Sequence, residues 1–325
     1  MRLFVALVSL ILVQAVSPDS WAGPVLDRIK SQGVIRCGAV SRPGLVDVGS
    51  NHVARGLLLD ICRAIGAAVL PPDGRLEFHQ YDSSVDFDAV RNGADDIFFL
   101  SASEIIEENL AGKVVPGPTV FYQSISVMVP ESSKAQHLAD LAGEPICFFQ
   151  GGNADNRIEA WFAHNKLDFV RMGYQEDVEM YDAYNAQVCH AMAAEATTLA
   201  KVRLTRGVND VHSRIIEEPI EAFPILAATG ATDAEWSAIV AWSVHTLVSA
   251  GAPATHGVAG GADSLPVEAP ELGLTRGWRE RVVRAAGPYD AMYGRNLGDG
   301  STYKLSRGLN GAWRTGGLML PPHAE

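Results

Sequence analysis

The chain contains a short, almost entirely apolar run near its start, Val34-Ile35-Arg36-Cys37-Gly38-Ala39-Val40. Runs of this length and composition are typical of a strand that is buried on both faces. Apolar residues then recur at helical spacing over 57–69, and the pattern stops before two prolines, which cannot continue a helix. Further strand patterns at 76–79 and 96–100 enclose a short helical segment at 87–93. This β-α-β-α-β order predicts a parallel, doubly wound sheet.

The same order of elements recurs in the second half of the chain. Residues 145–149 form another apolar strand pattern, and two glycines at 151–152 lead into a helical segment at 157–164. A strand at 169–170, a helix at 180–187 and a strand at 188–192 complete the unit. A chain of 325 residues exceeds what one hydrophobic core usually supports. Two α/β lobes are therefore expected.

The remaining segments predict extended chain at 215–225, then a helix that starts at Thr232 with Glu235 in a capping box. A loop rich in Gly, Ala and Pro over 251–270 precedes a last basic, amphipathic helix at 278–286. Two tryptophans, Trp236 and Trp313, are expected in the core.

Composition excludes several classes of protein. Lys and Arg total 26 and Asp and Glu total 38, so the net charge is 26 − 38 = −12. This balance argues against a nucleic-acid partner, because neutralising phosphates requires a basic face. Hydrophobic residues make up 47% and charged residues 20% of the chain, which is ordinary for a globular protein.

The first 22 residues have the pattern of an export signal. Arg2 precedes an apolar run at 3–16, and Ser20-Trp21-Ala22 offers small residues at the −3 and −1 positions of a cleavage site. The run is shorter than the about 20 residues that span a bilayer, so an N-terminal membrane anchor is the less favoured alternative. We expect cleavage after Ala22 and a mature, soluble protein in the periplasm.

The four cysteines agree with export, because an even number in an exported chain suggests disulfides. Four cysteines allow three pairings. They fall into two clusters, Cys37 with Cys62 and Cys147 with Cys189, and pairing within each cluster would cross-link each lobe separately. We therefore prefer the pairings Cys37–Cys62 and Cys147–Cys189. A zinc site is the alternative, but the chain has no Cys-x-x-Cys spacing to support it.

No catalytic or cofactor motif stands out. The nine histidines have no His-Glu-x-x-His spacing, and neither Gly-x-Ser-x-Gly nor a Walker-type Gly-x-x-x-x-Gly-Lys occurs. We therefore expect no metal and no cofactor, and predict that the protein is not an enzyme.

Several segments resemble the family 3 periplasmic solute-binding proteins of amino-acid ABC transporters, in particular the general L-amino-acid-binding type. The run Ile29-Lys30-Ser31-Gln32-Gly33-Val34 is similar to the start of that family's opening strand, and Asp60-Ile61-Cys62-Arg63-Ala64 to its first helix. Residues 288–298 and 307–318 resemble the C-terminal extension of this type. The resemblance covers nearly all of the mature chain, and the four cysteines stand where this type has its two disulfides.

The resemblance implies a two-lobed periplasmic-binding-protein fold of type II. Each lobe would be a doubly wound mixed sheet, and two crossover strands would join the lobes. We place the first part of lobe 1 at 23–126, lobe 2 at 127–222, and the return of lobe 1 with the C-terminal extension at 223–325. It further implies a monomer that binds a small solute between the lobes and docks on an ABC permease in the inner membrane.

The ligand site departs from the family pattern. Binders of α-amino acids in this family hold the carboxylate with an arginine, since a guanidinium matches a carboxylate in bidentate geometry. That arginine is absent, because its position falls near Glu108. The family's ligand-stacking aromatic residues are missing at 44–47. Its aspartate for the ligand ammonium aligns with Glu195, which keeps the charge.

Three interpretations stay open. In the first, the protein binds amino acids through a carboxylate clamp rebuilt from Arg42 or Arg157. In the second, an acidic pocket binds a cationic solute through Glu195, helped by Glu104, Glu107 or Asp155. In the third, the scaffold no longer serves uptake and acts as an accessory partner of another periplasmic protein or as an enzyme similar to cyclohexadienyl dehydratase. Binding of a different small solute is a further alternative. The candidate ligand-binding residues are Arg42, Ser101, Ser103, Asn153, Arg157 and Glu195.

Overall fold

The computed structural model describes residues 23–48, 54–81, 87–204, 212–251 and 268–320. The export signal predicted at 1–22 and most of the loop predicted at 251–270 lie outside the described residues. Within the described part, no helix is both long enough and apolar enough to span a membrane.

The first predicted β-α-β-α-β unit is present. Strand β1 (Val34–Val40) pairs in parallel with β4 (Arg75–Tyr81) on one side and with β5 (Ile97–Ser101) on the other. Helix α2 (Leu57–Val69) connects β1 to β4, and α3 (Phe87–Arg91) precedes β5. The smaller elements of this part are α1 (Pro24–Gln32), β2 (Asp47–Val48), β3 (Ala54–Arg55), α4 (Ala102–Glu107) and β6 (Val114–Val115).

The second unit is also present, and the bounds of several of its elements differ by a few residues from those predicted. The strand predicted at 188–192 is β10 (Ala191–Glu195). It begins later because the preceding helical turn extends to Val188, whose backbone N–H donates to the carbonyl of Ala183. The other elements are η1 (Leu138–Leu141), β8 (Pro145–Phe149), α5 (Asp155–His164), β9 (Val170–Tyr174), α6 (Asp177–Asn185), α7 (Ala196–Val202) and β11 (Ser213–Ile215).

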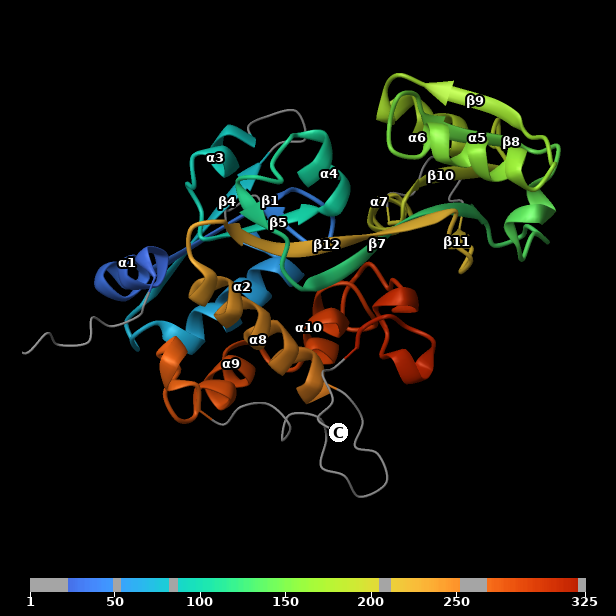
Figure 1. Cartoon of the computed structure of the whole chain (residues 1–325). Helices are drawn as coiled ribbons and strands as arrows, with labels where there is room; N and C mark the ends of the chain where they lie inside the picture. Colours follow the sequence, from blue (N-terminus) through green and yellow to red (C-terminus); the bar gives the residue numbers. More distant parts are fainter. Residues whose placement is uncertain (1–22, 49–53, 82–86, 205–211, 252–267, 321–325) are drawn as a thin grey trace, which may run out of the picture.

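Two long strands join the two units. Strands β7 (Thr119–Pro130) and β12 (Glu221–Gly230) run antiparallel to each other and pass from one unit to the other (Figure 1). Strand β12 pairs with β5, and β7 pairs with β10. The hydrogen-bonded order is therefore β4-β1-β5-β12-β7-β10-β8-β9, with both parallel and antiparallel neighbours. The chain has the predicted two-lobed α/β fold with mixed sheets, and the crossover strands make the two sheets continuous.

Separate hydrophobic cores lie on either side of the crossover. The buried residues of the two core clusters in the first unit come from 26–121 and 225–319. Those of the two clusters in the second unit come from 125–216. This separation supports the lobe boundaries proposed at 126/127 and 222/223, which stay a prediction.

The C-terminal segments pack on lobe 1. Helices α8 (Ala234–Gly251), α9 (Trp278–Ala286) and α10 (Tyr289–Asn296) lie with α2 on one side of its sheet (Figure 1). The Asn310 side chain bonds both the N–H and the carbonyl of Tyr122 on β7. The described part of this region also contains the short 3-10 helices η3 (Pro270–Leu272), η4 (Gly308–Asn310) and η5 (Trp313–Thr315).

The two tryptophans expected in the core have different outcomes. Trp236 is fully buried, and its indole N–H donates to the carbonyl of Asp96. The prediction for Trp313 is wrong, because 42% of this residue is exposed. It lies in a single 3-10 turn near the end of the extension, and the sequence pattern does not show which side of such a short turn faces the core.

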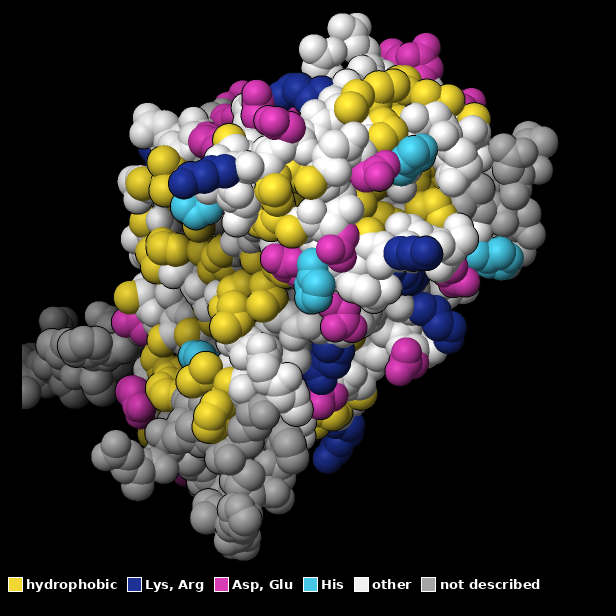
Figure 2. All heavy atoms as spheres, turned by 90° about the vertical axis from the view of Figure 1, so that its right-hand side faces the viewer, with side chains coloured by type: hydrophobic (Ala, Val, Ile, Leu, Met, Phe, Trp, Pro, Cys, Tyr) yellow, Lys and Arg dark blue, Asp and Glu magenta, His cyan; other side chains and the backbone are white. Residues whose placement is uncertain are grey.

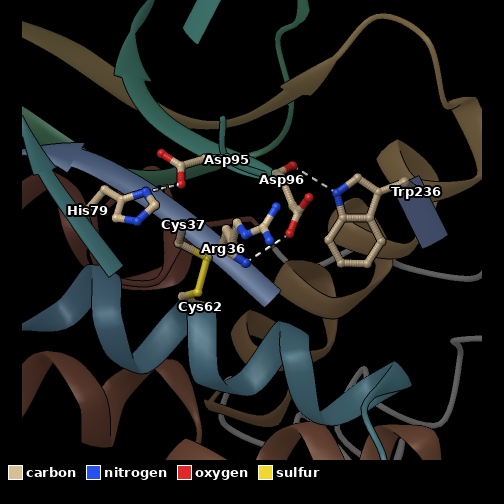
Figure 3. Close-up of a disulfide and its surroundings, with 7 residues drawn as sticks. All are labelled: Arg36, Cys37, Cys62, His79, Asp95, Asp96 and Trp236. Atoms are coloured by element: carbon tan, nitrogen blue, oxygen red, sulfur yellow. Dashed lines mark hydrogen bonds and ion pairs between the residues drawn. A yellow bond between two sulfur atoms is a disulfide. The ribbon is translucent and has the colours of Figure 1, made fainter. Parts of the chain in front are cut away.

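Both preferred disulfide pairings are confirmed. Cys37 is bonded to Cys62, which ties β1 to α2 with the Cα atoms 6.4 Å apart (Figure 3). Cys147 is bonded to Cys189, which ties β8 to the segment before β10 with the Cα atoms 5.6 Å apart. Each bond lies within one lobe, so neither restricts the movement of one lobe relative to the other.

Candidate ligand-binding site

Most of the candidate residues follow strand ends that face the boundary between the lobes. Arg42 lies two residues after β1, and Ser101 is the last residue of β5, so both lie at the carboxyl edge of the lobe-1 sheet. Glu195 is the last residue of β10 in lobe 2, and Asn153 lies in the loop after β8. In open α/β sheets, ligands bind at this edge of the strands. The topology therefore brings residues from both lobes to one place.

Three charged side chains meet there, which we call the charged cluster: Arg42, Glu104 and Glu195. The guanidinium of Arg42 is 3.1 Å from Oε1 of Glu104 in its own lobe and 3.4 Å from Oε2 of Glu195 in the other lobe. The three side chains are 10%, 20% and 14% exposed. Charges that are shielded from water to this extent interact more strongly than exposed ones. The Arg42–Glu195 pair is a direct electrostatic link between the lobes.

Glu195 is held by two amides as well as by Arg42. The Asn153 side chain donates to Oε1 at 2.8 Å, and the Gln123 side chain donates to Oε2 at 3.1 Å. Gln123 is fully buried on the crossover strand β7, and it also donates to the hydroxyl of Thr197 at 2.8 Å. This set of donors fixes the orientation of the carboxylate at the start of α7.

Glu104 is held by the end of its own helix. Its Oε2 accepts the backbone N–H of Ser101 at 2.6 Å, and its backbone N–H donates to the Ser101 hydroxyl at 3.1 Å. This reciprocal arrangement is a capping box, which satisfies two donors at the start of α4. The Ser103 hydroxyl lies 3.0 Å from that of Ser101. The two serines therefore position Glu104, whose second oxygen remains directed at Arg42.

The loop that carries Arg42 is fixed from the C-terminal extension. The Tyr303 hydroxyl donates to both carboxylate oxygens of Asp47 at 3.0 Å, and Asp47 accepts the backbone N–H of Gly44 at 2.8 Å. Burial, with the nearby Asp47 charge, raises the pKa of Tyr303 to about 12, so the hydroxyl keeps its proton at neutral pH. Gly44 has φ +74°, and a Cβ there would lie 2.3 Å from Leu297. The loop can approach the extension this closely only because residue 44 lacks a side chain.

Arg157 lies apart from the charged cluster. Its Nε is 2.9 Å from Oε2 of Glu221 on β12, and its Nη1 donates to the backbone carbonyl of Asn153. Asp155 is engaged as well, because it pairs with Arg171 at 2.8 Å and accepts the N–H of Gly151. Glu107 is exposed. The structure thus brings together five of the six candidates with Glu104, and the role of Arg157 stays a prediction.

Gln123 and Thr197 were not found from the sequence. A signal existed for Gln123, since an amide side chain interrupts the apolar positions of a strand that the structure buries. Thr197 had no signal, because its role depends on which face of α7 turns towards β7. In the part of the chain that the structure describes, no group of three or more His, Cys, Asp and Glu side chains could hold a metal ion.

Comparison with known proteins gives relatives of nearly full length. The general L-amino acid-binding periplasmic protein of Rhizobium johnstonii is 24% identical, with 95% of each chain covered. The glutamate/glutamine/aspartate/asparagine-binding protein of Rhodobacter capsulatus is 25% identical, with 91% of this chain and 92% of the relative covered. No family model matches the chain.

A solved structure supports the same fold. A periplasmic binding protein of an ABC transporter from Brucella ovis, with glutathione bound, superposes with a TM-score of 0.67 and is 23% identical. The comparison covers 91% of this chain and 98% of that protein. The curated relatives are named as binding proteins and not as enzymes. The resemblance inferred from the sequence is therefore confirmed, because the chain is similar over nearly its whole length to periplasmic binding proteins of amino-acid ABC transporters.

Proposed function

We propose that the protein is the solute-binding component of an ABC importer and binds an amino acid or a related small amine between its two lobes. The observation that carries this proposal is the Arg42–Glu195 contact of 3.4 Å across the lobes. It supports the first interpretation of the sequence, with Arg42 in place of the missing family arginine.

The charges of the cluster are complementary to those of an amino acid. Arg42 can hold the ligand carboxylate, since a guanidinium offers paired donors to two oxygens. Glu195 can accept the ligand ammonium, and Glu104 can share in that contact. Without ligand, Arg42 and Glu195 neutralise each other, so neither is left as an isolated charge in a shielded place. An entering amino acid replaces this internal pair with one ion pair to each lobe.

Such a ligand would favour the closed form. It contacts lobe 1 through Arg42 and lobe 2 through Glu195, and both contacts are possible only when the lobes are close together. A ligand shifts a conformational equilibrium by its difference in affinity for the two forms. The closed, loaded protein would then dock on the permease as a monomer.

The proposed location is the periplasm, after cleavage behind Ala22. The relative from Rhizobium johnstonii is named as periplasmic. Both disulfides are consistent with an oxidising compartment. The net charge of −12 makes nucleic acid an unsuitable partner.

Calorimetric titration with three matched ligand sets tests the proposal: L-amino acids and glutathione, amines without the carboxylate, and acids without the amine. We expect amino acids or glutathione to bind best. Glu195→Gln should weaken this binding at least tenfold, which corresponds to about 1.4 kcal/mol. Arg42→Gln should weaken it similarly but should not weaken the binding of a carboxylate-free amine, because that ligand does not use the guanidinium and Arg42 competes with it for Glu195.

Glu131→Gln is the matched control. It removes the same charge from the residue that directly follows β7. Glu195 pairs with Ile125 on this strand, so Glu131 lies six residues further along the chain and away from the ligand site. This variant should bind as the unmodified protein does. Unchanged affinity of the Glu195→Gln variant for every ligand that binds would refute the proposed site.

A further inference from the structure

A large groove lies at the end of lobe 1 that is remote from the charged cluster. Its volume is ≈ 880 Å³. It is bounded by the end of α2, the beginnings of β1 and β4, and helix α9. Because the strands are parallel, the amino ends that border this groove lie at the opposite edge of the sheet from Arg42. The groove is thus separate from the proposed amino-acid site.

The groove is lined by cations. Among the described residues, its lining includes no Asp or Glu and five basic residues: Lys30, Arg63, Arg75, Arg281 and Arg284. This is unusual for a chain with a net charge of −12. On the face shown in Figure 2, by contrast, acidic and basic side chains are intermixed. We call this site the basic groove.

Two of the five cations are already engaged. Arg281 donates to the backbone carbonyls of Ala67 and Ala68, which belong to the last turn of α2. Arg63 pairs with Asp60 at 2.7 Å. Lys30, Arg75 and Arg284 have no ion-pair partner among the described residues. These three charges are available to a ligand.

The wall between the cations is apolar. It is formed by Ile35, Val69, Leu70, Pro71, Pro72 and Leu76. A free inorganic anion would use the charges but leave this wall in water. An acid with a hydrocarbon or aromatic body would satisfy the cations and also bury apolar surface, which stabilises by about 25 cal/mol per Å². The groove volume falls in the usual range for small-molecule sites, about 300–1,000 Å³.

We propose that the basic groove binds a small amphipathic organic anion, that is, a carboxylate, sulfonate or phosphate on an apolar body. Its three unpaired cations, Lys30, Arg75 and Arg284, hold the acidic group, and the apolar wall holds the body. The proposal is independent of the amino-acid site, because the two sites lie at opposite edges of the lobe-1 sheet.

Fluorescence titration with 1-anilinonaphthalene-8-sulfonate tests this site in the full-length mature protein. We expect saturable binding of one probe molecule, with displacement by decanoate but much weaker displacement by decanol or by sulfate. The variant Lys30→Gln, Arg75→Gln, Arg284→Gln should bind the probe at least tenfold more weakly. All three residues are exposed, so the fold should tolerate the changes.

A second triple variant separates a local site from a general effect of charge. Lys113→Gln, Lys166→Gln, Lys201→Gln changes the net charge by the same amount at exposed positions outside the groove. It should bind the probe within twofold of the unmodified protein. Equal weakening in both triple variants, displacement by decanol as strong as by decanoate, or absence of saturable binding would each overturn the proposal.

Discussion

Removal of the Cys147–Cys189 disulfide should destabilise lobe 2 selectively. Its cysteines are 42 residues apart in the chain, and both are fully buried. In the chain-entropy model, closing a loop of this length lowers the entropy of the unfolded chain and so stabilises the folded protein by about 4 kcal/mol. The double variant Cys147→Ala, Cys189→Ala is preferred to serine, since a buried hydroxyl without a partner would add a separate cost.

Hydrogen exchange followed by mass spectrometry measures this effect segment by segment. Slowly exchanging amides of β8 and β10 should exchange about 10³-fold faster in the variant, because 1.4 kcal/mol corresponds to a factor of ten. Amides of β1 and α2 should be unchanged. The matched variant Cys37→Ala, Cys62→Ala opens a loop with a separation of 25 residues. It should produce the reverse pattern, with a loss of about 3.5 kcal/mol in lobe 1.

The reasoning would be refuted if the Cys147→Ala, Cys189→Ala variant accelerated exchange equally in β8 and in β1. The two lobes would then unfold together as one unit, because the crossover strands connect them, and their two hydrophobic cores would not unfold independently. Acceleration of less than tenfold in β8 and β10 would refute the loop-closure estimate instead.

Two further predictions concern buried carboxylates of lobe 1. Asp233 accepts hydrogen bonds from the backbone N–H groups of Val25, Leu26 and Trp236. The Asp233→Ala variant should therefore lower the free energy of unfolding, measured by urea denaturation, by about 3 kcal/mol. A loss below about 1 kcal/mol would contradict this role. Burial raises the pKa of Asp95 above its ordinary value of 3.8, and this effect outweighs the hydrogen bonds with Tyr81 and His79, which lower the pKa. In the window just above pH 3.8 the folded carboxyl therefore keeps a proton that the unfolded one loses, so stability relative to Asp95→Asn should fall as the pH rises. A difference that stays flat or rises would contradict this pKa shift.

Helix ends show where local patterns stop being sufficient. The sequence suggested that Thr232 and Glu235 begin a helix with a capping box, but α8 begins at Ala234 and Asp233 accepts the N–H of Trp236. Asp233 also accepts two N–H groups of α1, more than 200 residues away. A cap that serves two helices depends on how they pack, which no local pattern contains.

The order of strands and helices within the two β-α-β-α-β units followed from apolar periodicity, because this is a local property of the chain. The crossover strands followed only from the family resemblance, and the disulfide pairings were a preference among three possibilities. The partners of the candidate residues did not follow. Arg42 and Glu195 are 153 positions apart, and whether a guanidinium meets a carboxylate or points to solvent depends on the angle between lobes and the paths of loops. The partner of Arg157 was likewise not predictable from the sequence, because its pairing with Glu221 depends on its position beside β12. The chemistry of the site is therefore set by tertiary packing, which sums many weak contacts between distant residues.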